Sequence, residues 1–384
     1  MGEGSALAIY VHIPFCLSKC PYCDFNSRPL GDDRTLLDRY QEALVREQEL
    51  RAEEFGGRPA ATVYFGGGTP TIMPSDRLVG MLAAVGARWP TGGATEVSVE
   101  ANPGTVEEAG LRVLREGGFN RLSLGVQSFD EQALRSLGRV HDADQAREAI
   151  AAARGAGFDN LSLDLMFAVP GQTSERWEAS LAEAIGYRPE HLSLYGLTIE
   201  PGTRFHEMAA AGAVTPCDDE TELTMFRRAI EIARESGYEH YEISNYARTG
   251  RRCRHNETYW RGGDYLGFGA GAHSFVGGVR WGNVADPEVY IERLARGISP
   301  VASIERLSAS RRAAEALTLG LRMIEGVPFD GSAGSARGGD LSAACEAEIR
   351  ALCTEALLEL SDGRLRLTKT GLALANEVFV RLVE

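Results

Sequence analysis

The sequence predicts an α/β protein, with a partial (β/α)6 barrel followed by a small C-terminal domain that is helical and winged-helix-like. Between residues 7 and about 197, short β-rich runs alternate with longer helical patterns, as in βα units around a parallel sheet. A four-residue pattern, apolar-Ser-apolar-X, recurs here with its serines at Ser98, Ser123, Ser162 and Ser193. The gaps of 25, 39 and 31 residues each leave room for one strand and one crossover helix.

Six strands are predicted in this region. They are IYVHIP (9–14), TVYFGGG (62–68), VSVE (97–100), LSLG (122–125), LSLD (161–164) and LSLY (192–195). Helical spacing lies between them at 36–51, 75–88, 131–137, 143–154 and 175–186. These helices would cover the outside of the sheet. Because there are six units and not eight, we expect an incomplete barrel that is open along one side.

Polar residues recur on one face of the predicted strands. Residues two apart in a strand share a face, so Glu100, Gln127 and Asp164 lie on the face of the repeated serines. Carboxylates are costly in a dry core, but these positions are near the carboxyl ends of strands, where barrel sites form. Each side chain alone is equally well explained as a helix cap or a loop hydrogen-bonding group. Three at equivalent register favour a ligand site.

Three cysteines follow the first strand in one short loop. Cys16, Cys20 and Cys23 have the spacing C-x-x-x-C-x-x-C. Pro14 and Pro21 argue against a continuous helix through them, so the loop is expected to wrap around a bound group. Three is the wrong number for local disulfides.

A structural zinc site normally has four protein ligands, so zinc would need His12 or a distant side chain as the fourth. A cubic 4Fe-4S cluster with one open iron fits three thiolates better. The open iron can take the amino and carboxylate groups of S-adenosylmethionine. The aromatic ring of Tyr22 would then flank the adenine.

Glycines follow the second strand directly, in Gly66-Gly67-Gly68-Thr69. Without side chains, the backbone there can approach a ligand closely, although a tight turn would explain the glycines as simply. Their position beside the cysteine loop favours the ligand. Arg139 can pair with a ligand carboxylate, or it can be an ordinary solvent-facing arginine.

The segment RTGRRCRHNETYWR (248–261) carries five arginines within an acidic protein. A flat, anionic, aromatic ligand such as a porphyrin would suit these guanidinium groups and the ring of Trp260. His255, Cys253 or Tyr259 could ligate a heme iron. A charged surface loop with an ordinary structural histidine explains the segment equally well.

The C-terminal part predicts a second domain, with the division at 1–300 and 301–384. After a helix at 219–236, the later pattern is a helix at 308–324, a Gly/Ser-rich connection, a helix at 341–360, an Asp-Gly hairpin in SDGRLRLT and a final helix. Winged helices often bind DNA. Here the second helix is rich in glutamate, which argues against phosphate contacts and favours a packing role.

Composition limits the partners and the compartment. The 384 residues carry a formal charge of -14, which repels nucleic acid and anionic membranes. No apolar run approaches transmembrane length, and the first residues lack the pattern of a targeting peptide. The remaining cysteines have no disulfide-like spacing, and with a thiolate-bound cluster they predict a reducing cytoplasm.

Together these elements resemble a known family. The cysteine spacing is similar to that of the radical S-adenosylmethionine superfamily, whose usual fold is the partial barrel. The segments HIPFCLSKCPYCDFN, YFGGGTPT, VEANPGT, RLSLGVQSF, LGRVH, LDLMFAVPGQT and HNETYWRGGDYLGFGAGAHS look like the oxygen-independent coproporphyrinogen III oxidase family, and most like its heme-chaperone subgroup. The resemblance implies that the cysteines hold the cluster. It also implies that S-adenosylmethionine is bound by Tyr10, Gly67, Gly68, Thr69, Glu100, Gln127, Arg139 and Asp164.

One departure from the family bears on function. The decarboxylating enzymes carry a further cysteine two residues after the third cluster ligand, where this sequence has Phe25. The His255-Asn256-x-x-Tyr259-Trp260 element is similar to the chaperone subgroup. The resemblance therefore implies a heme chaperone that passes heme to an unknown acceptor protein, which could be membrane-associated. The alternative is oxidative decarboxylation of coproporphyrinogen III to protoporphyrinogen IX, which would need an electron donor.

Overall fold

The computed structural model describes residues 6–329, 335–336 and 339–383. Residues 1–5, at the start of the N-terminal segment, lie outside the described residues, and so does part of the Gly/Ser-rich connection at 326–339. Among the residues described, no helix is both long and apolar enough to cross a bilayer.

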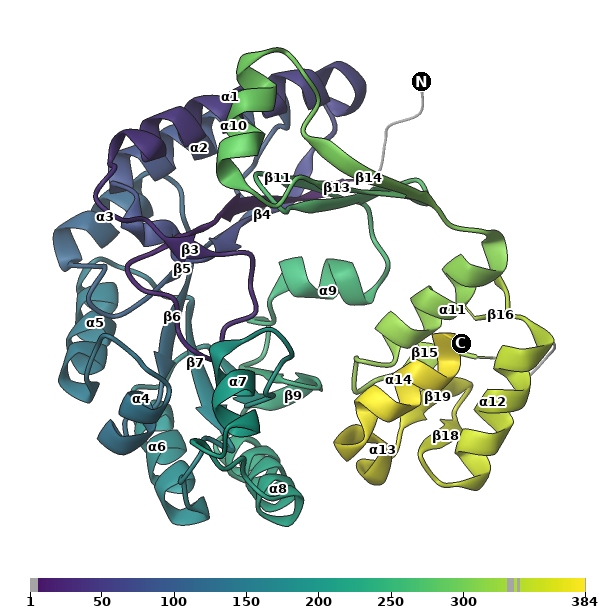
Figure 1. Cartoon of the computed structure of the whole chain (residues 1–384). Coiled ribbons are helices and arrows are strands. Elements are labelled where there is room, and N and C mark those ends of the chain that lie inside the picture. Colours follow the sequence, from purple (N-terminus) through teal and green to yellow (C-terminus); the bar gives the residue numbers. More distant parts are fainter. Residues whose placement is uncertain (1–5, 330–334, 337–338, 384) are drawn as a thin grey trace.

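Six parallel strands form the centre of a curved sheet (Figure 1). In spatial order they are β1 (Leu7–Ile13), β4 (Ala60–Gly67), β5 (Glu96–Ala101), β6 (Arg121–Gln127), β7 (Leu161–Phe167) and β8 (His191–Gly196). All six strands were predicted. The apolar residues that flank each repeated serine are buried, because they face the helices.

The register between neighbouring strands is staggered. Ser123 pairs with Ser162, but Glu100 pairs with Ser123 and Asp164 pairs with Ser193. The repeated patterns are therefore offset by two residues at two junctions, as the tilt of strands in a barrel requires. Because side chains alternate between faces, an offset of two residues leaves each side chain on its predicted face of the sheet.

Helices cover the convex side of the sheet (Figure 1). They are α1 (Thr35–Phe55), α2 (Ser75–Arg88), α3 (Glu108–Glu116), α4 (Glu131–Ser136), α5 (Ala143–Gly155), α6 (Ser174–Gly186) and α8 (Asp219–Glu235), with the short η1 (Pro70–Ile72) and α7 (Arg204–Ala210) in connections. The start of α5 has a local cause, since Asp142 and Gln145 form a reciprocal capping box. Helix α3 was not predicted. It has little more than two turns and buries only Leu111 and Leu114.

The sheet continues beyond the barrel at both edges. Next to β8 lie β10 (Asn245–Ala247) and β9 (Glu239–Glu242), and next to β1 lie β11 (Tyr265–Phe268), β12 (His273–Val276), β13 (Val279–Asn283) and β14 (Val301–Arg306). Helix α9 (Arg254–Trp260) lies on the concave side of the sheet, and α10 (Pro287–Ala295) packs against α1 (Figure 1). A separate pair, β2 (Phe15–Cys16) and β3 (Arg28–Pro29), closes the cysteine loop.

One buried carboxylate joins α1 to this extension. Glu47 is fully buried and accepts hydrogen bonds from the hydroxyl of Tyr290 at 2.6 Å, the amide of Asn283 at 2.7 Å and the backbone N–H of Gly269 at 2.9 Å. Burial raises the pKa of Glu47, and these three donors oppose that rise. The glycine-rich loop after β11 is therefore held in place by a side chain more than two hundred residues away.

The C-terminal part has a hydrophobic core of its own, whose buried members run from Ala313 to Leu382. It contains α11 (Ala309–Gly320), β15 (Val327–Pro328), β16 (Ser335–Ala336), β17 (Gly339–Asp340), α12 (Ala343–Thr354), β18 (Leu358–Ser361), β19 (Arg364–Leu367), α13 (Lys369–Ala373) and α14 (Ala375–Val383). The order of helix, helix, hairpin and helix agrees with the predicted winged-helix-like pattern. The division at residue 300 stays a prediction.

Two helix ends in this part were predicted wrongly. The helix expected to reach residue 324 ends at Gly320, and the helix expected over 341–360 ends at Thr354. Ala356 then takes a φ of 57°, and the chain enters β18. The hairpin turn was predicted correctly, since Asp362 and Gly363 both have positive φ, as a tight two-residue turn requires.

Candidate functional site

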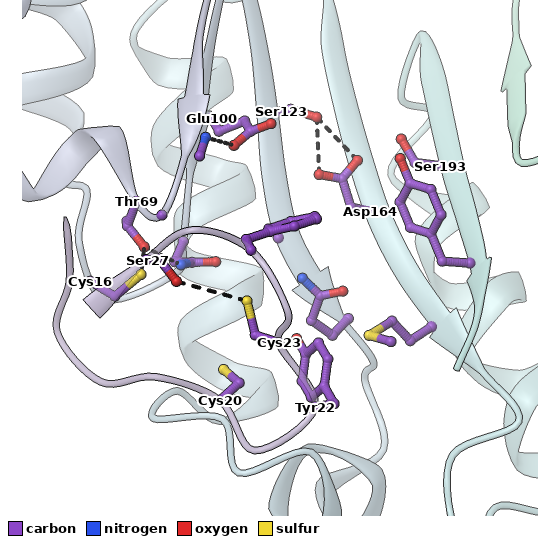
Figure 2. A pocket seen from close by; sticks show the side chains of 18 of the residues that line it. Cys16, Cys20, Tyr22, Cys23, Ser27, Thr69, Glu100, Ser123, Asp164 and Ser193 are labelled. Carbon is purple, nitrogen blue, oxygen red and sulfur yellow. Dashed lines mark hydrogen bonds between the residues drawn. The ribbon is translucent and has the colours of Figure 1, made fainter. Parts of the chain in front are cut away.

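A cavity of about 380 Å³ opens at the carboxyl ends of the parallel strands. Figure 2 shows the cysteine loop on one side of it and the carboxylates of Glu100 and Asp164 on the strands. The predicted site residues that line it are Cys16, Cys20, Tyr22, Cys23, Gly67, Gly68, Thr69, Glu100, Gln127, Arg139 and Asp164. The structure thus brings together residues that are up to 148 positions apart in the sequence.

The cysteine loop is held by backbone contacts. Strand β2 pairs with β3, so the start and the end of the loop lie side by side. Within the loop, the N–H of Cys23 donates to the carbonyl of Cys20 at 3.1 Å. Pro21 packs on Gly138, where a Cβ atom would lie only 2.7 Å from the proline ring. A side chain at Gly138 would therefore push the loop away from the sheet.

Each cysteine sulfur has a polar neighbour. The hydroxyl of Thr69 donates to Cys16 Sγ at 3.6 Å, Nη1 of Arg139 donates to Cys20 Sγ at 3.4 Å, and Cys23 Sγ lies 3.9 Å from the hydroxyl of Ser27. Burial raises the pKa of the Cys16 and Cys23 thiols. A bound metal centre would reverse this effect, because metal coordination deprotonates a thiol. Donors aimed at the sulfurs are the groups that tune an iron-sulfur centre.

The cysteine loop offers both the thiol ligands and the open space that a 4Fe-4S cluster needs. All three cysteines are free thiols and partly exposed to the cavity. At Gly68, a Cβ atom would lie 2.6 Å from the carbonyl oxygen of Phe15 and 2.9 Å from Cys16 Sγ, so only glycine keeps this wall clear. Within the described residues, no three His, Cys, Asp or Glu side chains are close enough to hold one single ion. A 4Fe-4S cube differs in this respect, because each thiolate binds a different iron.

Glu100 is held at the edge of the cavity by two donors. The hydroxyl of Tyr64 donates to Oε1 at 2.8 Å, and the backbone N–H of Gly67 donates to Oε2 at 3.1 Å. Burial raises the pKa of Glu100 to about 7, with a further contribution from the like charge of Asp164. Gly67 has a φ of 115°, and a Cβ there would lie 2.5 Å from the ring of His12. This backbone donor therefore depends on glycine.

Three of the four repeated serines contact Asp164. The hydroxyl of Ser123 donates to both carboxylate oxygens at 3.0 and 3.1 Å (Figure 2). The hydroxyl of Ser162 donates to Oδ1 at 3.2 Å. Burial raises the pKa of Asp164, and its serine neighbours, including Ser193, oppose that rise. These three serines of the sequence repeat therefore belong to the surroundings of Asp164.

Arg139 is a connecting residue rather than a free surface arginine. Its guanidinium donates to Asn102 Oδ1 at 2.5 Å and to the carbonyl of Gly125 at 3.1 Å, besides Cys20. Asn102 in turn donates to the hydroxyl of Thr69 at 2.8 Å. These bonds join the cysteine loop to the ends of β5 and β6. The buried Nε of Arg139 has no hydrogen-bond partner among the described residues, so it can still donate to a ligand.

Two other predicted residues lie at the margins. Gln127 sits in the cavity wall at an irregularity of β6 and has a φ of 64°. Tyr10 lies behind the wall, where its hydroxyl pairs with His12 Nδ1 at 2.9 Å and its ring stacks on Tyr64. Tyr10 can therefore act on a ligand only through its neighbours.

His255, predicted as a possible heme ligand, is 1% exposed on α9. Its Nδ1 pairs with the hydroxyl of Thr62 at 2.8 Å, its Nε2 pairs with the hydroxyl of Tyr259 at 2.8 Å, and its ring stacks on Tyr64. Burial lowers its pKa to about 3. Ligation of iron by His255 stays a prediction, and in this structure it would require one of these bonds to break.

The arginines of 248–261 already have protein partners. Arg252 forms ion pairs with Glu239 and, at 3.3 Å, with Glu257. Arg261 also pairs with Glu257, at 3.0 Å. Trp260 lies under the guanidinium of Arg322, which is 4.3 Å from the ring centroid. The structure therefore does not gather these arginines into an open anion site.

Several residues of the cavity were missed from the sequence. They are Ser27, Tyr64, Asn102, Arg121, Ser123, Ser193, Tyr195 and Asn256. The serines could have been found from the repeat itself, because a polar residue at a fixed place in a buried strand needs a partner. No sequence signal links Asn102 to Arg139, since their contact depends on how two loops meet.

Comparisons with known proteins agree with this geometry. The model of the radical SAM superfamily matches residues 10–184, and that of the HemN C-terminal domain matches residues 307–374. The solved structure of coproporphyrinogen III oxidase (HemN) from Escherichia coli, described as a radical SAM enzyme, has a TM-score of 0.83. It is 22% identical, covers 99% of this chain and 90% of its own, and supports the fold alone.

Two curated relatives match 96% and 70% of this chain. The heme chaperone HemW of Bacillus subtilis is 36% identical over 371 residues, which are 96% of this chain and 97% of the relative. The heme chaperone HemW of Escherichia coli is 41% identical over 270 residues, which are 70% of each chain. With the three-cysteine cavity on a partial barrel, these similarities show that the chain belongs to the HemW family within the radical SAM superfamily.

Proposed function

We propose that this protein is a heme chaperone, which binds heme and transfers it to an acceptor protein. The observation that carries the proposal is the similarity to heme chaperone HemW over 96% of this chain and 97% of the Bacillus subtilis relative. Phe25 adds to it. This side chain lines the cavity and is 61% exposed, in the position where the decarboxylating family has a further cysteine.

Cys16, Cys20 and Cys23 would hold a 4Fe-4S cluster, and the rest of the cavity would hold S-adenosylmethionine. Glu100 and the Gly67–Thr69 backbone would receive the amino group of the methionine part, and Tyr22 would flank the adenine. Asp164, with its serine donors, offers a carboxylate for ribose hydroxyls. When bound, the cluster and S-adenosylmethionine supply one-electron chemistry. Whether this protein uses that chemistry decides whether it is also an enzyme.

The experiment begins with anaerobic reconstitution of the cluster in the full chain. The same preparation is then assayed for stoichiometric heme binding and for decarboxylation of coproporphyrinogen III with a reductant present. We expect retained heme and no turnover. Turnover without retained heme would overturn the proposal and favour the oxidase. Transfer is tested by mixing the loaded protein with apoprotein acceptors and following the heme spectrum.

The remaining parts of the proposal concern partners and location. The acceptor is a heme-requiring protein, and any radical step would need an external electron donor. We place the protein in the cytoplasm, because an exposed loop of free thiols and a thiolate-bound cluster suit a reducing compartment. We also propose that the chain divides near residue 300 into the barrel with its extension and a C-terminal domain.

A further inference from the structure

A second cavity, of about 760 Å³, lies between the extension of the sheet and the C-terminal domain. One wall is formed by β11, β12 and β13, and the other by α11, which follows directly after β14 (Figure 1). The volume is within the range of about 300–1,000 Å³ that small-molecule and cofactor sites occupy. The first cavity, at about 380 Å³, has half that volume.

The sheet wall presents one histidine and a set of aromatic rings. In the register of the strands, His273 pairs with Gly282, while Phe275 pairs with both Arg280 and Tyr265. Since His273 and Phe275 are two residues apart, their side chains share the face that lines the cavity. This face carries the aromatic rings of Tyr265 and Phe275 beside His273.

His273 is free to act as a ligand. Its side chain is exposed, and neither ring nitrogen is hydrogen-bonded to any residue that the structure describes. A Cβ built on Gly282 would lie 2.8 Å from Cε1 and 3.1 Å from Nδ1 of this ring. The glycine therefore makes the space in which the imidazole lies. His255 differs on each point, being buried and bonded at both nitrogens.

The helix wall combines small apolar side chains with two charged ones, Arg312 and Glu315. Ala309, Ala313 and Ala316 of α11 line the cavity at a spacing of three to four residues, so they lie on one face of the helix, with Leu319 one turn further on. Small side chains opposite the aromatic rings of the sheet leave a slot between the two walls. A slot of this kind suits a planar ligand.

The charges at the rim suit a carboxylate. Arg312 lines the cavity beside Gly278, where a Cβ would lie 2.6 Å from Nη1, and its guanidinium has no acidic partner in the described part of the chain. Arg280 pairs with Glu315 across the slot. Asp264 is paired with Arg58 at 3.0 Å. Arg312 is therefore the cation that remains to bind a ligand anion.

We propose that this second cavity holds the heme, with the imidazole of His273 as an axial ligand of the iron and Arg312 paired with a propionate. The proposal rests on the proposed function, since it takes heme as the cargo. The cavity supplies three features that a metalloporphyrin needs: apolar and aromatic walls, an imidazole nitrogen donor and a cation without an acidic partner among the described residues. The first cavity suits heme less well, because it has half the volume and is already assigned to the cluster and S-adenosylmethionine.

Tyr259 links this site to the element predicted from the sequence. It lines the second cavity, and its ring meets Tyr265 edge to face at a centroid distance of 4.7 Å. The His-Asn-x-x-Tyr-Trp element thus contributes a wall residue, while His255 positions that residue through the bond between Nε2 and the tyrosine hydroxyl.

The test uses the full chain with its cluster reconstituted, hemin as the probe, and three variants. His273→Ala should remove the imidazole signature from the resonance Raman and EPR spectra and raise the Kd for heme at least about tenfold, since even supporting groups of metal sites cost that much. Arg312→Ala should raise the Kd about threefold, the scale of one exposed ion pair. Ala316→Trp should fill the slot and abolish binding. Cluster absorbance should be unchanged in all three.

The controls separate this site from the function itself. His206→Ala removes another exposed histidine, on α7, and should leave the spectrum and the Kd unchanged. If wild-type protein retains heme but His273→Ala keeps both spectrum and affinity, the proposed site is wrong and the chaperone function stands. If wild-type protein retains no heme, the function itself fails. Should Ala316→Trp unfold, as thermal melting would reveal, the spectrum of His273→Ala decides alone.

Discussion

Replacement of Glu100 by glutamine should remove one component of the pH dependence of stability in the cluster-free protein. The pKa of this buried carboxyl is raised from 4.5 to about 7, mainly by burial. A carboxyl with a higher pKa in the folded state binds its proton more tightly when folded. The resulting stability is complete below pH 4.5, and it is lost as the pH rises to about 7.

The size of this effect follows from the pKa. Each unit of difference between the folded and unfolded pKa is worth about 1.4 kcal/mol, so the rise from 4.5 to about 7 lowers the stability at pH 8 by about 3 kcal/mol. Glutamine stays neutral and retains an oxygen that accepts from the N–H of Gly67. The hydroxyl of Tyr64 must then turn to accept from the new amide, which costs about 1 kcal/mol if the geometry is poor. We therefore expect Glu100→Gln to be about 2 kcal/mol more stable than wild type at pH 8.

The assay is urea unfolding of both apoproteins at several pH values between 5 and 8. The difference in unfolding free energy should be near zero or slightly unfavourable to the variant at pH 5, and it should grow towards pH 8. Other titrating groups, Asp164 included, are present in both proteins and largely cancel in the difference. A difference that does not vary with pH would refute the assignment of a raised pKa to Glu100.

Three further predictions concern the loop and its supports. Replacing Cys16, Cys20 and Cys23 together with alanine should leave no cluster after reconstitution, and a cluster that persisted in absorbance and EPR spectra would contradict the ligand assignment. Gly68→Ala should lower the iron content and cost about 1–3 kcal/mol through overpacking against Phe15 and Cys16. The control Gly80→Ala, with open space around it inside α2, should leave the iron content unchanged and raise stability by about 0.5–1 kcal/mol, because alanine favours a helix more than glycine does. Glu47→Ala should cost about 3 kcal/mol or more in urea unfolding, because three buried donors lose their acceptor, and a loss below 1 kcal/mol would show that water replaces the carboxylate.

The strands and the polar face could be predicted because they follow from local rules. An alternation of β-rich and helical segments identifies βα units, and the period of two in a strand assigns faces. Neither rule depends on how the strands tilt. For this reason, the stagger between Glu100 and Ser123 was missed while the shared face was found.

The contacts that depend on packing could not be predicted. His255 and Trp260 looked suited to a porphyrin because only their types and spacing were visible. In the folded chain His255 is bonded to a threonine 193 residues away, and Trp260 is covered by Arg322. The second cavity is a stronger example, since its walls come from strands and a helix that share no pattern in the sequence. Only the pairing of β12 with β13 brings His273 and Arg280 onto one face.

Helix α9 explains how one short sequence element can serve two sites. Asn256 lines the first cavity and Tyr259 lines the second, so the helix forms part of the partition between them. His255 lies within this partition and joins Tyr259 to Thr62, while its ring stacks on Tyr64, the donor to Glu100. Its low pKa keeps the ring neutral at physiological pH. A neutral histidine with both ring nitrogens hydrogen-bonded is held rigidly in place. Packed side chains and hydrogen bonds therefore connect Glu100 and Tyr64, at the first cavity, with Tyr259 in the wall of the second.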